Sequence, residues 1–428
     1  MAINWLIYKQ AFEMKKFSVA DLETVNRANK GLGNYQKLCS SGWNVAKQDV
    51  SLPCLCLYES RLKNNIQWMA DYTKKSHVLF APHGKTTMTP AIFKKQLAAG
   101  AYAITVATVA QSHAAVKSGA KRVLMANQLV GRANCQQLDE LLVANDITFY
   151  CLVDNLDNIR MLGEYFANTK HTIHVLIELG VPGGRCGVVD SKELALLVAE
   201  IANYQSLALA GIEVYEGVLS QTEAVSQFLE YAVATCKQLI ADNAFDTQQV
   251  MITAGGSAFY DLVCEAFHPE KLTQNMVAVL RPGCYVTHDQ GIYEQAQQQI
   301  LARNELACSL ETELTSCLEI WAYVQSIPEP GRVIIGFGKR DAAFDAGFPI
   351  PSLQVDQNGQ VSKADPAWKI EKMMDQHAMM KVPLDCTLRV GDIVAFATSH
   401  PCLTFDKWRY INVIDDRYNV IDVVETYF

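Results

Sequence analysis

Residues 78–87 read VLFAPHGKTT, a short apolar run followed by a loop that carries Lys85. The run at 78–81 has the length and composition of a buried strand. Similar runs recur along the chain, and the segments between them, such as 90–99, 109–118 and 193–203, have the amphipathic pattern of helices. The further runs lie at 103–107, 122–126, 147–153, 173–178, 209–214, 250–253 and 278–281.

This alternation of strand and helix predicts an α/β protein with a parallel sheet. Eight repeats favour a closed (β/α)8 TIM barrel. A doubly wound open sheet remains the alternative, because the alternation by itself fits that architecture nearly as well.

The helical rhythm stops after about residue 304, and the chain there becomes β-rich. The runs at 317–325, 332–338, 392–398 and 409–414 are strand-like, with turn sequences such as IPEPGR and QVDQNGQV between them. A chain of 428 residues also exceeds the usual size of one domain. We therefore expect an N-terminal extension at 1–50, the barrel at 51–304 and a mostly β domain at 305–428.

Composition narrows the classes of function. A formal net charge of −8 argues against a nucleic-acid or anionic-membrane surface and leaves a small-molecule site open. The thirteen cysteines show no framework spacing, and those in apolar runs, among them Cys151, Cys236, Cys264 and Cys308, predict buried thiols in a reducing compartment. No run approaches the ~20 apolar residues of a membrane span, and no signal-peptide pattern opens the chain, so we expect a cytoplasmic protein.

Lys85 follows the first predicted strand, at the end of a barrel where enzymes of this fold keep their active sites. A lysine among apolar and backbone groups there can lose its proton and form a Schiff base with an aldehyde cofactor. A solvated loop lysine is the plain alternative for an isolated residue. The neighbouring loops favour the first interpretation.

The seventh strand ends in Gly255, Gly256 and Ser257, directly before a helical stretch. Glycines let backbone N–H groups approach a phosphate, and a helix N-terminus favours its charge. Barrels commonly hold phosphate in this loop, although ordinary turns use the same residues.

Other strand ends add Arg185, Tyr215 and Tyr285. An arginine there can hold a cofactor oxygen, and tyrosines can stack on a ring or bind a phosphate. Arg185 is equally compatible with a surface ion pair, and Tyr215 with a core aromatic.

In the second domain, His400 and Cys402 form a His-x-Cys pair after a predicted strand. An imidazole and a thiolate on one side of an extended segment suit zinc. The other ligands would be water, substrate or a distant side chain, and an open position is typical of a catalytic metal. Two residues at this spacing remain a weak metal signal.

The order of eight motifs resembles the D-serine dehydratase/D-threonine aldolase family of fold-type III pyridoxal-phosphate enzymes. The motifs are APHGKT, ANQLV, ELGVPGGRCGV, GIEVYEG, TAGGSAFYD, RPGCYVTHD, GKRDAAFDAG and SHPCLTFD. The resemblance runs from about residue 51 to the C-terminus and implies an alanine-racemase-like barrel, a β domain and a homodimer. Ala81, where the family often has arginine, and the VPGG stretch at 181–184 depart from the pattern and leave the substrate open.

By this resemblance, Lys85 is the Schiff-base lysine and general base, and His400 with Cys402 is the zinc pair of the dehydratase branch. The aldolase branch typically has His-x-Asp there, so Cys402 favours dehydration. The resemblance also implies cofactor contacts for His83 and Gln128 in the pocket, Arg185 near the phenolate oxygen, Tyr215 at the pyridine ring, and Gly255, Gly256, Ser257 and Tyr285 at the phosphate.

We therefore expect pyridoxal phosphate and zinc to support β-elimination from a D-3-hydroxy amino acid, converting D-serine or a close analogue to an oxo acid and ammonia. An aldolase-type cleavage of Cα–Cβ uses the same cofactor and is the nearest alternative. A non-catalytic pyridoxal-phosphate protein is the alternative from another class, against which the long β domain with its His-x-Cys pair counts. A racemase is less favoured, because no tyrosine stands out as its second base.

Overall fold

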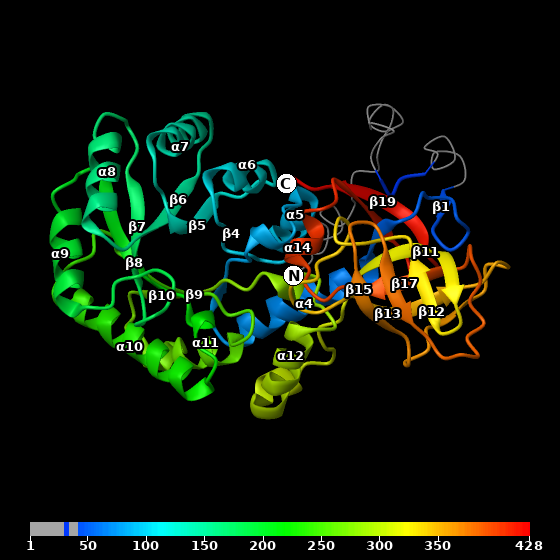
Figure 1. The fold of residues 1–428 in the computed structure, drawn as a ribbon. Coiled ribbons are helices and arrows are strands. Elements are labelled where there is room, and N and C mark those ends of the chain that lie inside the picture. Colours follow the sequence, from blue (N-terminus) through cyan, green and yellow to red (C-terminus); the bar gives the residue numbers. More distant parts are fainter. Residues whose placement is uncertain (1–29, 34–41) are drawn as a thin grey trace, which may run out of the picture.

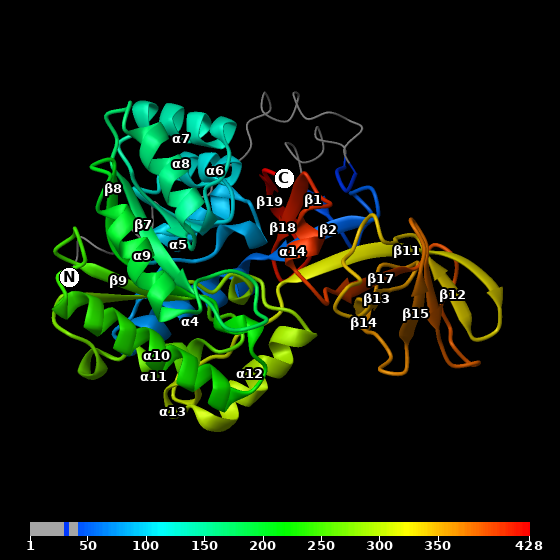
Figure 2. The same cartoon turned by 60° about the vertical axis from the view of Figure 1, so that its left-hand side comes forward.

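The computed structural model describes residues 30–33 and 42–428. A parallel barrel and a mostly antiparallel sheet lie side by side (Figures 1 and 2). The extension expected at 1–50 falls outside the described residues except at 30–33 and 42–50. Within the described ranges, no helix combines the length and apolarity that crossing a bilayer requires.

The barrel contains eight parallel strands, one on each of the eight predicted runs. Its two ends meet where His83 pairs with Thr105 and where the N–H of Tyr102 donates to the Phe80 carbonyl at 2.7 Å. The sheet therefore closes, which confirms the barrel and excludes the open sheet. In spatial order the strands are β3 (Leu79–Phe80), β10 (Met276–Leu280), β9 (Val250–Ala254), β8 (Leu207–Val214), β7 (Ile173–Leu179), β6 (Thr148–Val153), β5 (Arg122–Gln128) and β4 (Ile104–Val106).

Helices cover the outside of the barrel (Figure 1). Several begin at a side-chain cap that satisfies free N–H groups: Thr108 accepts from the Gln111 N–H, and Asn155 from the Asn158 N–H. The helices are α4 (Glu59–Lys75), α5 (Pro90–Ala98), α6 (Val109–Lys117), α7 (Arg132–Ala144), α8 (Leu156–Phe166), α9 (Ser191–Ile201), α10 (Thr222–Ala241), α11 (Tyr260–Ala266), α12 (Ile292–Arg303) and α13 (Glu305–Cys308). Short 3₁₀ turns are η1 (Gly84–Thr86), η2 (Glu216–Val218), η3 (Pro269–Lys271) and η4 (Cys284–Val286).

A separate apolar cluster fills the barrel interior, with one residue from or beside each strand. Small side chains face larger ones, as required to pack a tapering interior without voids. This cluster closes the barrel beneath its C-terminal mouth. Its members are Ala81, Ala103, Leu124, Leu152, Leu176, Ala210, Met251 and Val279.

The second sheet has eleven strands and includes two that precede the barrel in sequence. β2 pairs in parallel with β18 and antiparallel with β11, so residues 54–58 lie in the β domain and not in the barrel, where we expected them. Local sequence cannot reveal such pairing, because its partners lie far along the chain. The strands are β1 (Trp43–Asn44), β2 (Cys54–Tyr58), β11 (Leu318–Glu329), β12 (Arg332–Ile335), β13 (Ile350–Val355), β14 (Val361–Lys363), β15 (Lys369–Met373), β16 (Ala378–Lys381), β17 (Ile393–Ala397), β18 (Tyr410–Ile414) and β19 (Asn419–Glu425).

α4 therefore leads from the β domain into the barrel, and the short helix α14 (Cys402–Phe405) lies where the two meet (Figure 1). Most of the cysteines expected to be buried are so, including Cys151, Cys236 and Cys264. The expectation for Cys308 is wrong: its side chain is exposed at the end of α13, because the apolar run that contains it forms a surface helix.

Candidate active site

A cavity of about 840 Å³ opens at the C-terminal end of the barrel strands and is bounded on one side by the β domain. Its size suits a small ligand or cofactor. The barrel contributes Lys85, Arg185 and Tyr215 to its lining, and the β domain contributes His400 and Cys402. Residues more than 300 positions apart thus border one space.

Lys85 lies in η1, directly after β3, and is the only lysine among the described residues that line the cavity. The backbone N–H of Lys85 donates to Nδ1 of His83 at 3.5 Å. Burial, followed by the nearby positive charges of Lys85 and Arg281, lowers the pKa of His83 well below its usual value. His83 is therefore a neutral contact and does not compete for protons at neutral pH.

Arg185 and Tyr215 also line the cavity and stack on each other, with the Arg185 guanidinium carbon 4.5 Å from the centroid of the Tyr215 ring. Glu178 lies 3.7 Å from the Arg185 guanidinium. Nε2 of Gln128 donates to Glu178 at 2.6 Å, so Gln128 supports this pair and does not line the cavity, whereas its neighbour Asn127 does.

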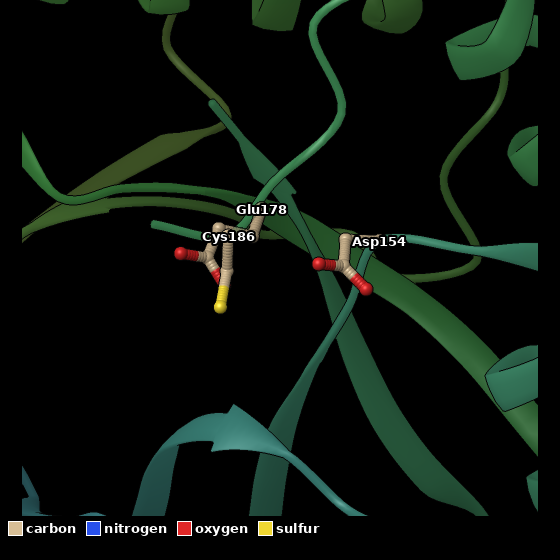
Figure 3. Close-up of side chains that lie close together, drawn as sticks. All are labelled: Asp154, Glu178 and Cys186. Atoms are coloured by element: carbon tan, nitrogen blue, oxygen red, sulfur yellow. The ribbon is translucent and has the colours of Figure 1, made fainter. Parts of the chain in front are cut away.

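Glu178 also belongs to a cluster with Asp154 and Cys186, whose ligand-type atoms all lie within 4.8 Å of one another (Figure 3). Asp154 accepts from the Gly187 N–H at 3.1 Å. Burial, followed by the charge of Glu213, raises the pKa of Glu178 to about 7. Because Glu178 already contacts an amide and a guanidinium, the cluster anchors the 180–188 loop that carries Arg185.

The glycine loop is only partly arranged as expected. The N–H groups of Gly255 and Gly256 donate to the buried Glu216 carboxylate, at 3.0 and 2.5 Å, so both donors already have a partner within the protein. Burial raises the pKa of Glu216. Ser257 does line the cavity, and its Oγ accepts from the Gly283 N–H at 3.2 Å.

Tyr285 lies outside the cavity lining. Its ring packs edge-on against Phe80, and its hydroxyl accepts from Nε2 of Gln96 at 2.8 Å, so its polar group is already satisfied in the core. Tyr293, at the start of α12, lines the cavity instead. The motif alone could not show which of Tyr285 and Tyr293 lines the cavity, because the direction of the Tyr285 side chain depends on the turn η4.

A buried ion pair borders the cavity from below, and sequence reasoning did not select it. Arg281 contacts Glu213 and also donates from Nε to Thr253 Oγ1 at 2.9 Å. The second oxygen of Glu213, Oε2, is buried without a hydrogen-bond partner. Glu213 lies in the motif GIEVYEG and Arg281 in RPGCYVTHD. The sequence analysis quoted both motifs but assigned no function to these two residues.

His400 and Cys402 reach the cavity from the β domain. Nδ1 of His400 lies 2.7 Å from Oδ2 of Asp345, within the GKRDAAFDAG motif. A hydrogen bond from the His400 imidazole to the Cys402 sulfur raises the pKa of His400 to about 9. The segment is not extended as expected, because Pro401 has helical angles (φ −60°, ψ −45°) and α14 begins at Cys402.

The Cys402 sulfur has two further neighbours, Sγ of Cys284 and Oγ1 of Thr86, each at 3.4 Å. Hydrogen bonds from Cys284, and then from His400 and Thr86, hold the pKa of Cys402 well below its usual value. The pKa of Cys284 is raised, chiefly by the same hydrogen bond and then by burial, so Cys402 is the more acidic of the two thiols.

These donors fit the two implied groups. A lysine amine, a stacked arginine–tyrosine pair and an unsatisfied buried carboxylate oxygen border a space of suitable size for pyridoxal phosphate. The fit also depends on Gly255, because a Cβ there would lie 2.8 Å from the Tyr215 ring and force that ring to move. Imidazole and thiolate are donors that zinc prefers.

Two family descriptions match the chain. "Alanine racemase, N-terminal domain" matches residues 58–289, and "Putative serine dehydratase domain" matches residues 317–414. The first spans more than half of the chain and covers the barrel. The second covers most of the β domain.

Individual proteins of known name or structure are similar to this chain over nearly its whole length. A D-threonine aldolase from Arthrobacter sp. is 24% identical over 86% of this chain and 90% of its own. The structure of a D-threonine aldolase from Filomicrobium marinum has a TM-score of 0.75 at 23% identity, covering 90% of this chain and 97% of its own. A D-threo-3-hydroxyaspartate dehydratase from Delftia sp. HT23 has a TM-score of 0.68 at 18% identity, covering 90% and 98%. Together with the family matches, these similarities show that the chain belongs to the alanine-racemase-like, fold-type III family of pyridoxal-phosphate enzymes, with a D-serine-dehydratase-like domain.

Proposed function

We propose that this protein is a pyridoxal-phosphate lyase, assisted by zinc, that eliminates water from a D-3-hydroxy amino acid and releases an oxo acid and ammonia. D-Serine, giving pyruvate, is the simplest such substrate. The observation that carries the proposal is that Lys85 from the barrel and the His400–Cys402 pair from the β domain line one cavity.

Each group has a distinct task in this proposal. The bound cofactor supplies an electron sink for the charge that develops at Cα. The ε-amine of Lys85 would hold the cofactor, and its Nζ would accept the Cα proton of the substrate. His83 accepts a hydrogen bond from the backbone N–H of Lys85. Because its lowered pKa keeps it neutral, it adds no positive charge near the lysine amine.

Arg185 and Tyr215, whose side chains stack on each other, would orient the cofactor ring. Ser257 lines the cavity and would hold the phosphate, and Glu213 and Arg281 line the same cavity as a buried ion pair. His400 and Cys402 would hold zinc, whose chemistry is that of a Lewis acid for the β-hydroxyl leaving group.

The same site could cleave Cα–Cβ, as the names of the aldolase relatives suggest. Cys402 is the observation that favours elimination, because the aldolase branch, as judged from the motif, has a carboxylate there. A protein that only binds the cofactor is the third possibility, and absence of turnover on every substrate would favour it.

The test is incubation of the cofactor-loaded protein with D-serine, D-threonine and D-3-hydroxyaspartate, with and without zinc. We expect ammonia and an oxo acid, 2-oxobutyrate in the case of D-threonine, and loss of both when zinc is chelated. Glycine and acetaldehyde from D-threonine would instead assign the aldolase reaction. Full elimination activity after chelation would refute the role of the metal.

We also propose that the barrel, at about 59–304, binds the cofactor, that 305–428 together with 43–58 forms the metal-carrying domain, and that the chain is a homodimer. Support for the dimer comes from three apolar side chains that line the cavity yet are exposed: Ile292 at 51%, Leu403 at 41% and Phe428 at 53%. A second copy would cover them. Light scattering after gel filtration gives the mass directly, and a monomer would refute this part.

A further inference from the structure

Two thiols from different domains meet at the edge of the active-site cavity. Cys284 lies in η4, directly after barrel strand β10, and Cys402 begins α14 of the β domain. Their Sγ atoms are 3.4 Å apart, and both residues line the cavity. The pair therefore joins two elements, 118 positions apart in the chain, across the contact between the domains.

The two sulfurs are close enough to form a disulfide after a small movement. The sulfurs of a disulfide are about 2.05 Å apart, so these two would have to approach by about 1.4 Å. Both cysteines lie in short elements, a turn of three residues and a helix of four. Side-chain rotation together with a slight shift of either element supplies this approach, and the barrel and the second sheet stay as they are.

The cavity gives small reagents access to the pair. Cys402 is partly buried, whereas Cys284 is only 3% exposed, so a reagent that enters the cavity reaches the Cys402 sulfur first. Oγ1 of Thr86 lies 3.4 Å from the Cys402 sulfur, and the Tyr293 hydroxyl hydrogen-bonds to Cys284. These hydroxyls can relay the protons that the two thiols lose when their sulfurs join.

Neither sulfur spacing nor a place in the cavity is sufficient alone. Cys54 and Cys56 have their sulfurs 3.5 Å apart, yet both side chains are fully buried in the second sheet and neither lines the cavity. Cys186 lines the cavity, but it lies in the cluster with two carboxyl groups and not beside another thiol. Cys284 and Cys402 combine the two conditions.

We propose that Cys402 is a site of oxidation by hydroperoxides and that Cys284 converts the product to a disulfide between the barrel and the β domain. In the first step the Cys402 sulfur takes one oxygen from the hydroperoxide and becomes a sulfenic acid. The thiol proton passes to the leaving oxygen, which departs as an alcohol, or as water when the reagent is hydrogen peroxide.

In the second step the Cys284 sulfur attacks the sulfenic sulfur and displaces hydroxide, which takes up the Cys284 proton and leaves as water. The two thiols together lose two electrons, and the hydroperoxide is reduced by two. A thiol reductant reverses the change by exchange with the disulfide.

The disulfide removes the Cys402 sulfur from the His400–Cys402 pair and also ties the two walls of the cavity together. Oxidation therefore switches the lyase off, and reduction restores it. This consequence rests on the proposed function, whereas formation of the disulfide does not.

Peptide mapping of the cofactor-loaded full chain tests the disulfide directly. The protein is treated with a chelator to remove metal, then with hydrogen peroxide, and its remaining thiols are blocked before digestion without reductant. We expect a peptide pair linked through Cys284 and Cys402, the loss of two of the thirteen thiols, and recovery of both after reduction. Cys402 oxidised without a link, or a link between Cys54 and Cys56 in its place, would overturn the proposal.

Two variants show which thiol does what. Cys284→Ser should give no linked peptide and leave Cys402 at the sulfenic or sulfinic stage. Cys186→Ser, which removes another thiol of the same cavity, is the matched control and should keep the link. Loss of the link in both variants would overturn the assignment of Cys284, and if Cys284→Ser does not fold, the map of the unmodified chain decides.

Activity is measured separately, after zinc is returned to the oxidised protein. Turnover of D-serine or D-threonine should fall in proportion to the linked fraction and recover on reduction. A complete link with full activity would overturn the switch. A protein that forms the link but has no lyase activity in its reduced state would refute the proposed function and leave the disulfide standing.

Discussion

The Nδ1 atom of His400 lies 2.7 Å from the Oδ2 atom of Asp345, a residue 55 positions earlier in the chain. This contact fixes the imidazole so that Nε2 is the nitrogen left for a metal. Carboxylate–histidine pairs of this kind orient metal ligands and raise their basicity. In the proposed zinc site, Asp345 is thus a positioning residue.

Asp345→Asn should weaken zinc binding by about 10- to 100-fold, because an amide holds the imidazole less firmly and does not raise its basicity. Competition with a chromophoric chelator measures the affinity. Asp375→Asn is the matched control, since Asp375 forms only an exposed ion pair with Arg340. Equal zinc affinities in the two variants would contradict the positioning role of Asp345.

Lys85→Ala should abolish covalent attachment of pyridoxal phosphate, because the ε-amine that reacts with the aldehyde is removed. Borohydride reduction followed by peptide mapping detects the adduct. Lys94→Ala, which changes an exposed lysine on α5, should keep the adduct at Lys85. A labelled peptide elsewhere in the Lys85→Ala protein would show that another lysine carries the cofactor.

Glu213→Ala should lower the free energy of unfolding by about 3–5 kcal/mol, because it leaves the Arg281 guanidinium buried without its ionic partner. Urea denaturation of the cofactor-free protein measures this loss. Glu329→Ala removes the partner of an exposed arginine, Arg332, and should change stability by no more than about 1 kcal/mol. Similar losses in both variants would mean that breaking the buried ion pair costs no more free energy of unfolding than breaking the exposed one.

The stability of the protein should fall between about pH 4.5 and pH 7 because of Glu178. Its pKa is raised from 4.5 to about 7, so in this interval the folded state binds more protons than the unfolded state, and the free energy of unfolding decreases as pH rises. Above pH 7 both states are ionised and the effect is constant. The shift corresponds to an upper value of about 3 kcal/mol.

Glu178→Gln should remove this slope, and chemical denaturation at several pH values between 4 and 8 measures it. Glu230→Gln changes an exposed carboxyl group on α10 and serves as the control. Unchanged slopes in both variants would show that the Glu178 carboxyl is ionised throughout the interval.

The sequence by itself determined the eight parallel strands and the place of Lys85 after the first of them. Each of the eight strands coincides with an apolar run, because parallel strands buried on both faces need continuous apolar residues that local inspection can recognise. Lys85 was identifiable because it follows the first of these strands, and strand ends of one type meet at one end of a barrel. His400 and Cys402 were identifiable because they lie two residues apart.

Only the tertiary structure decided which side chains share the cavity. Cys284 and Cys402 are separated by 118 positions, and their contact depends on how the β domain packs against the barrel. Packing also places Gln128 and Tyr285 outside the cavity lining. Gln128 hydrogen-bonds to Glu178, and Tyr285 hydrogen-bonds to Gln96. Hydrophobic periodicity is a property of neighbouring residues and specifies elements, whereas contacts between distant side chains arise only when those elements close around a common core.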